Sequence, residues 1–214
     1  MTPSLTDGRT IRRLVSVPDE LDMIRANQLD IDRALVLVID LQAQLLPAIG
    51  RHGAIVAATC KLLEGTSVFS LPVLATEQYP KGIGHTVPEI RRRLKALDAH
   101  VFEKSTFSAC DDPNISEALR RIDRPQVIIA GIEAHICVQQ TALDLRTMDY
   151  DVFVCADAVG SRGRIDCEQA LHRMRQADVL VTTVESALFE LCDRCDTDRF
   201  KGMLEVIKAH PPAD

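Results

Sequence analysis

Residues 34–40 read ALVLVID, and this stretch decides the fold. Its six consecutive apolar residues are flanked by Asp32 and Arg33 on one side and by Asp40 on the other. A short apolar run without alternation is typical of a strand that is buried on both faces of a parallel sheet. Further strands are predicted at PVLAT (72–76), HVFE (100–103), QVIIA (126–130), VFVC (152–155) and VLVT (179–182).

Helical patterns separate these strands. A further helix is expected to start at Pro113, with Asp111 or Asp112 as its cap, and Pro211 is expected to stop a last helix. Strands that alternate with helices predict right-handed crossovers and a parallel sheet covered on both faces. The expected architecture is therefore α/β, three-layer and Rossmann-like. The other helices are predicted at 53–69, 89–97, 134–148, 164–177 and 185–191.

Composition limits the classes of partner. The chain has 214 residues, of which 46% are hydrophobic, and is expected to form one domain at 34–210 after a polar N-terminal extension at 1–33. A net charge of -6 supplies no basic surface for nucleic acid or an anionic membrane, so a small-molecule partner is expected. No apolar run is long enough to span a membrane, no secretory signal is recognisable, and the seven cysteines are scattered. These features predict a cytoplasmic protein with reduced thiols.

Ligands of open parallel sheets bind beyond the carboxyl ends of the strands, which directs attention to Asp40, Glu77, Lys104 and residues 131–137. Asp40 is either a helix cap or a general base. Lys104 is either a solvated surface group or a cation that stabilises a thiolate. Cys137 is either a small core residue or a nucleophile whose pKa is lowered by the start of a helix. The residues alone leave these alternatives open.

Several segments, in this order, resemble the isochorismatase-like cysteine hydrolase family. They are ALVLVIDLQAQLLPAI, LATEQYPKGIGHTVPEI, FEKSTFSA and IIAGIEAHICVQQTALDLRTMDYDVFVCADAVGSR. The resemblance extends over nearly all of 34–210 and is strongest to the subgroup of isochorismatase domain-containing proteins. Each fragment alone is a weak signal, whereas their joint occurrence is a strong one. The resemblance implies a six-stranded parallel sheet in the order 3-2-1-4-5-6.

The resemblance also implies a catalytic triad of Asp40, Lys104 and Cys137. It implies a non-proline cis peptide between Ile132 and Glu133, and an oxyanion hole formed by the backbone N–H groups of Glu133 and Cys137. The expected reaction is hydrolysis of an amide or related C–N bond in a small molecule through a thioester. A homo-oligomer is expected, of a size that the sequence does not specify. Substrate-binding candidates, chosen by their position near the motifs, are Gln42, Gln78, Tyr79, Phe107, Glu133 and His135.

No metal and no cofactor are predicted. Nicotinamidases, which are similar elsewhere, carry an Asp-x-His pair after the second strand, whereas this chain has Thr76, Glu77, Gln78 and Tyr79 there, and His85 alone is not a metal site. The Cys-x-x-Cys pair at 192–195 is interpreted as chance spacing. Two alternatives to an enzyme remain: a binding or assembly protein that keeps the fold, and a thiol-based redox sensor.

Overall fold

A parallel sheet forms the centre of the molecule, which the computed structural model describes over residues 27–211. Within these residues six strands lie in the order β3-β2-β1-β4-β5-β6, and every neighbouring pair is parallel. This topology confirms the predicted fold. The strands are β1 (Ala34–Ile39), β2 (Val73–Gln78), β3 (His100–Lys104), β4 (Gln126–Ile132), β5 (Asp151–Gly160) and β6 (Leu180–Thr182).

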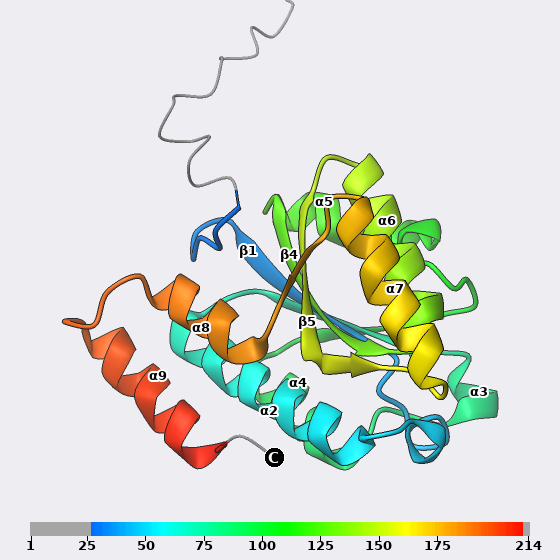
Figure 1. Ribbon diagram of the computed structural model, residues 1–214, viewed down its shortest axis with the longest axis horizontal. Coiled ribbons are helices and arrows are strands. Elements are labelled where there is room, and N and C mark those ends of the chain that lie inside the picture. Colours follow the sequence, from blue (N-terminus) through cyan, green and yellow to red (C-terminus); the bar gives the residue numbers. More distant parts are fainter. Residues whose placement is uncertain (1–26, 212–214) are drawn as a thin grey trace, which may run out of the picture.

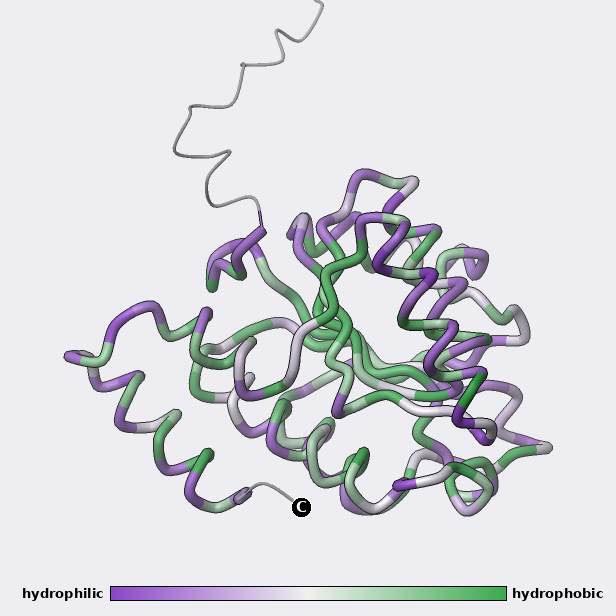
Figure 2. Tube along the Cα trace, in the orientation of Figure 1, coloured by the Kyte–Doolittle hydropathy of each residue, from purple (hydrophilic) through white to green (hydrophobic). Residues whose placement is uncertain are grey.

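Strand β1 lies in the middle of the sheet, and all six of its residues are buried. Val36 pairs with Val73 of β2 on one side and with Ile128 of β4 on the other. Figure 2 shows the strands as the apolar centre of the molecule, with the hydrophilic positions on the surrounding helices and loops. The continuous run ALVLVI is apolar because both faces of this strand are covered.

Helices cover the two faces of the sheet (Figure 1). Side chains alternate along β1, so that Val36 and Val38 join one apolar core and Leu35 and Leu37 join the other. The first core is closed by α2 (His52–Phe69), α4 (Pro88–Ala96), α8 (Val184–Cys192) and α9 (Asp198–Ala209). The second is closed by α5 (Pro113–Ile122), α6 (Gln139–Thr147) and α7 (Arg164–Gln176).

Local signals placed most helix ends correctly. Asp112 caps α5 by accepting hydrogen bonds from the N–H groups of Asn114 and Ile115, which selects it over Asp111. The predicted helix at 134–148 is instead a π-helical turn followed by α6, and the loop after β2 contains a one-turn helix. These extra turns are η1 (Leu46–Ala48), α3 (Pro80–Ile83), η2 (Ala109–Asp111) and η3 (Ala134–Val138).

The start of the described chain packs against the domain. Leu29 is buried, and its N–H donates to Glu190 of α8. The N–H of Asp30 and the carbonyl of Gln28 both bond to the Gln126 amide. Residues 27–33 of the predicted extension are thus in contact with the fold, and residues 1–26 lie outside the described residues. Within 27–211, no helix has the length and apolar character needed to cross a membrane.

Candidate active site

The strand order reverses between β1 and β4, so the chain leaves these two strands in opposite directions and opens a crevice at their carboxyl ends. Asp40 follows β1 directly and has a left-handed φ of 53°, a conformation that aspartate tolerates. Its carboxylate is completely buried. The Thr76 hydroxyl donates to one oxygen at 2.7 Å, and the Lys104 ammonium donates to the other at 2.8 Å. Asp40 is therefore a fixed, paired carboxylate in the core.

Lys104 is the last residue of β3, and its side chain has no exposed surface. Besides Asp40, its ammonium donates to the Gln78 side-chain oxygen at 2.6 Å and to the carbonyls of Thr106 at 3.1 Å and Phe107 at 3.2 Å. A buried ammonium is costly unless its hydrogens have acceptors, and here four oxygens replace water. The pair with Asp40 is thus a structured ion pair in the interior, and the interpretation of Lys104 as a solvated surface group is wrong.

Cys137 lies in the π-helical turn η3, and it is 7% exposed. π-Helical turns are rare and are frequent at functional sites. Asp40 and Lys104 are both close enough to the thiol to shift its pKa. Burial and the Asp40 carboxylate raise the pKa of Cys137 to about 12, and the Lys104 ammonium opposes them only in part. The expectation of a lowered pKa is wrong, because loss of water and a nearby negative charge outweigh the cation.

The backbone before Cys137 approaches β1 closely. Gly131 has a φ of 142°, and a Cβ atom there would lie 2.2 Å from the Ile39 carbonyl oxygen. Only glycine fits this position. The peptide bond between Ile132 and Glu133 is cis. Because Gly131 has no side chain, the end of β4 lies directly against Ile39, the residue that precedes Asp40.

The Glu133 side chain is directed to β5 and not to open space. Its carboxylate accepts hydrogen bonds from the N–H of Arg162 at 3.0 Å and from the Arg162 guanidinium at 3.1 Å. His135 is half-buried, and its Nδ1 lies 2.9 Å from the Ser161 hydroxyl. Both predicted substrate-binding side chains are therefore held by residues that immediately follow β5.

The remaining substrate-binding candidates divide into two kinds. Gln42 is completely buried, and its amide bonds to the backbone of Gln78 and Gly84, so no polar atom of this side chain is left for a substrate. Tyr79 and Phe107 are 58% and 56% exposed. They flank the loop around Lys104: the Tyr79 N–H and the Phe107 carbonyl both bond to this lysine. Both residues are therefore adjacent to Lys104 through their backbones, and their rings are exposed.

Three supporting residues were not predicted: Thr76, Ser161 and Arg162. Ser161 and Arg162 directly follow β5, and Thr76 lies two residues before the end of β2, so all three are near strand ends. Thr76 was the last residue of the predicted second strand, so the strand-end rule selected Glu77, the residue that follows it. Ser161 and Arg162 were missed because β5 was expected to end at Cys155, five residues before its observed end at Gly160.

Glu77 and His85 form a cluster of their own at the end of β2. One Glu77 oxygen accepts from the N–H and hydroxyl of Thr86, and the other lies 2.8 Å from His85 Nδ1. Burial raises the pKa of Glu77, but the bonds from Thr86 and His85 outweigh it, so the pKa is lowered overall. Within 27–211, no three His, Cys, Asp or Glu side chains are grouped as metal ligands.

Cys192 is buried, Cys195 is exposed, and both are free thiols.

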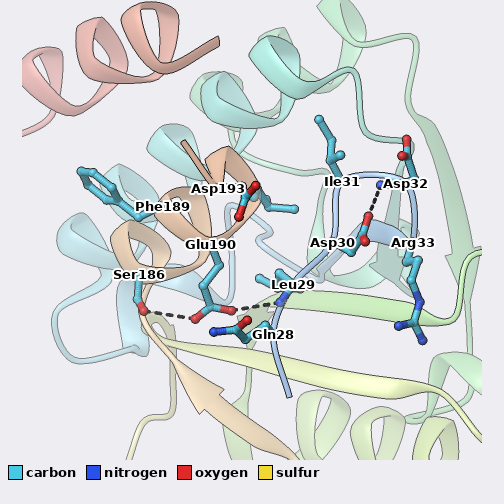
Figure 3. A pocket seen from close by; sticks show the side chains of 11 residues that line it. Gln28, Leu29, Asp30, Ile31, Asp32, Arg33, Ser186, Phe189, Glu190 and Asp193 are labelled. Carbon is cyan, nitrogen blue, oxygen red and sulfur yellow. Dashed lines mark hydrogen bonds between the residues drawn. The ribbon is translucent and has the colours of Figure 1, made fainter. Parts of the chain in front are cut away.

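Two cavities are relevant to the placement of the site. A cavity of about 450 Å³ lies between α2 and α7 and adjoins the candidate site. Its lining includes Ser161 and Arg162, which hold the side chains of His135 and Glu133. A cavity of about 530 Å³ lies before the start of β1, at the amino ends of the strands and thus at the opposite end of the sheet. Figure 3 shows this second cavity, where Glu190 of α8 bonds to the backbone of Leu29. Its distance from the strand ends separates it from the candidate triad.

The strand order and the polar groups at its switch point define a doubly wound α/β protein with a candidate site at the carboxyl ends of its strands. The protein-family model described as "Isochorismatase domain" matches residues 34–186 of the sequence. The chain therefore belongs to the isochorismatase family.

Relatives support this assignment. "Isochorismatase domain-containing protein 1" of Danio rerio is 35% identical over 94% of this chain and 70% of its own. A Caenorhabditis elegans structure described as MAR1 ribonuclease is 34% identical, with a TM-score of 0.81 over 86% of this chain and 95% of that chain. The YcaC product of Escherichia coli, described as an octameric hydrolase of unknown specificity, is 28% identical, with a TM-score of 0.82 over 86% of this chain and 91% of that chain.

Proposed function

We propose that this protein is a cysteine-dependent hydrolase that cleaves an amide or related C–N bond of a small molecule. The observation that carries the proposal is the buried pair of Asp40 and Lys104 beside the Cys137 thiol. A buried ion pair contributes little to stability on balance, so its presence next to a thiol favours a chemical role.

In the first half of the reaction Asp40 accepts the proton of the Cys137 thiol while the sulfur attacks the carbonyl carbon. Because the resting thiol holds its proton firmly, transfer and attack are coupled. Lys104 offsets the negative charge that forms on the sulfur. The N–H groups of Glu133 and Cys137 stabilise the oxyanion, and within 27–211 the Glu133 N–H has no other hydrogen-bond partner.

The second half regenerates the thiol. Asp40 gives its proton to the departing nitrogen, the C–N bond breaks and a thioester remains on Cys137. A water then loses a proton to Asp40 and attacks the thioester carbon. The C–S bond breaks, the acid product leaves, and Asp40 returns the proton to the sulfur.

We further propose that residues 34–210 form the catalytic domain and that the protein works as a homo-oligomer in a reducing, cytoplasmic environment. The octameric description of YcaC and the seven free thiols support these points. Light scattering after gel filtration tests the assembly: a single-chain mass refutes it.

The MAR1 name of the C. elegans relative makes RNA a rival substrate. The acidic chain, at a net charge of -6, favours the small molecule.

The deciding experiment is a screen of small amides, ureas and a short RNA with the wild type and the Cys137→Ala variant. We expect the wild type to hydrolyse a C–N bond, the variant to be inactive, and acyl adducts on Cys137 to appear by mass spectrometry in the wild type only. Cys155→Ala is a matched control, because Cys155 is also a buried free thiol but lies within β5, outside the crevice. Equal activity of Cys137→Ala and wild type, or cleavage of RNA alone, refutes the proposal.

A further inference from the structure

Gln78 makes the shortest hydrogen bond to the buried ammonium of Lys104, at 2.6 Å. The two residues are register partners in the pairing of β2 with β3, so their side chains leave neighbouring strands at the same level. The Gln78 amide nitrogen donates to the Ser105 carbonyl at 3.0 Å. This second bond fixes the orientation of the amide, because reversal would place N–H donors against the ammonium.

The backbone of Gln78 is held as firmly as its side chain. Its N–H donates to the Gln42 side-chain oxygen at 2.7 Å, and its carbonyl accepts from the Gln42 amide nitrogen at 3.0 Å. Gln42 is completely buried and follows Asp40 by two residues, with its N–H bonded to the Asp40 carbonyl. A chain of hydrogen bonds therefore runs from the Asp40 backbone through Gln42 and Gln78 to the Lys104 ammonium.

We infer that Gln78 is a positioning residue that aims the Lys104 ammonium at Asp40 and Cys137, and that Gln42 holds Gln78 in place. This inference rests on the proposed function and replaces the expectation that both glutamines contact substrate. The amide of Gln78 has used its polar groups on Lys104 and Ser105, and that of Gln42 has used its own on Gln78 and Gly84.

A neutral amide suits this task better than a carboxylate. A glutamate at this position would also accept a bond from Lys104, but its charge would cancel the cation and oppose formation of the Cys137 thiolate. Gln78 holds the ammonium with a dipole and leaves its positive charge available to the sulfur.

The first test is the pH profile of Cys137 alkylation by iodoacetamide, followed by peptide mass spectrometry. Gln78→Glu is expected to move the profile to higher pH by about one unit, which lowers the thiolate fraction about tenfold at a fixed lower pH. Because a more basic thiolate is also about threefold more nucleophilic, the net slowing of Cys137 alkylation is about threefold. Gln126→Glu is the matched control. The Gln126 side chain also bonds to backbone groups, but it is buried at the amino end of β4, so its profile should coincide with that of the wild type. Coincidence of the Gln78→Glu profile with the wild type overturns the inference.

The second test uses Gln78→Met, which removes the acceptor without adding charge. With the substrate found in the hydrolysis screen, kcat is expected to fall about tenfold while KM stays within about threefold, as for a group that acts on the reacting atoms through another residue. A rise in KM at unchanged kcat would instead make Gln78 a substrate contact and overturn the inference. Failure of the proposed function is distinguishable, because it would appear as hydrolysis by Cys137→Ala, whereas the alkylation profiles require no substrate.

Discussion

Replacement of Asp40 by asparagine is expected to change the reactivity of Cys137 and the turnover of substrate in opposite directions. Asparagine keeps the shape of the side chain and tolerates the left-handed φ of 53°. Its oxygen can accept from Lys104, and the Thr76 hydroxyl can reverse from donor to acceptor. The substitution therefore removes one negative charge and leaves the packing of the site in place.

The magnitude follows from the causes of the raised thiol pKa, in which the Asp40 charge comes next after burial. A unit charge about 4 Å away contributes about 4 kcal/mol at an effective dielectric constant of about 20, or about three pKa units. At about pH 8 the thiolate fraction of Cys137 then rises about 1000-fold. Because a less basic thiolate is also about 30-fold less nucleophilic, the net acceleration of alkylation is about thirtyfold. Hydrolysis is expected to fall by about 10²- to 10⁴-fold, since the proton acceptor is lost.

The assay is alkylation by iodoacetamide resolved peptide by peptide, with the exposed Cys195 as an internal reference in the same digest. Lys104→Met provides the opposite sign: loss of the cation raises the pKa of Cys137 further and slows its alkylation. Thermal unfolding of each variant checks that it is folded. Slower alkylation of Cys137 in Asp40→Asn, or turnover at the wild-type rate, refutes the charge arrangement proposed for the site.

Two further predictions concern stability. Gly131→Ala is expected to destabilise the fold by about 3 kcal/mol or more, because the new Cβ meets the Ile39 backbone at a positive φ; urea unfolding measures this, and an unchanged midpoint refutes it. Glu77→Gln is expected to be less stable than wild type at neutral pH. Since the pKa of Glu77 is lowered in the fold, its stabilisation is present above the ordinary value of 4.5 and is lost as the pH falls below it, so the urea midpoints should converge in acid; a gap independent of pH contradicts this.

The sequence predicts the fold well, because the buried strands are continuous apolar runs and the helices between them carry recognisable ends. It predicts β5 poorly, since residues 156–160 read ADAVG and look like a loop. Asp157 within them accepts a bond from the N–H of Val184, 27 residues further along the chain. A tertiary contact of this kind leaves no local signal, and the position of Ser161 was lost with it.

The candidate triad could be located from strand ends and from the resemblance, but its electrostatics could not. Proximity to a helix start predicted a lowered pKa for Cys137, whereas burial and Asp40 raise it. The positions of Gln42 and Gln78 near the motifs suggested substrate contacts, and only the three-dimensional hydrogen bonds reveal that they hold Lys104 and the Asp40 loop.

The proton retained on the buried Cys137 sulfur has a consequence for the lifetime of the protein. Peroxides attack thiolates and react slowly with thiols, so a raised pKa keeps the sulfur in its less oxidisable form. Exposed Cys195 is open to solvent and would be damaged first. In the proposed mechanism Cys137 becomes reactive only when a substrate occupies the crevice, so the weak acidity of the thiol protects it from oxidation at other times.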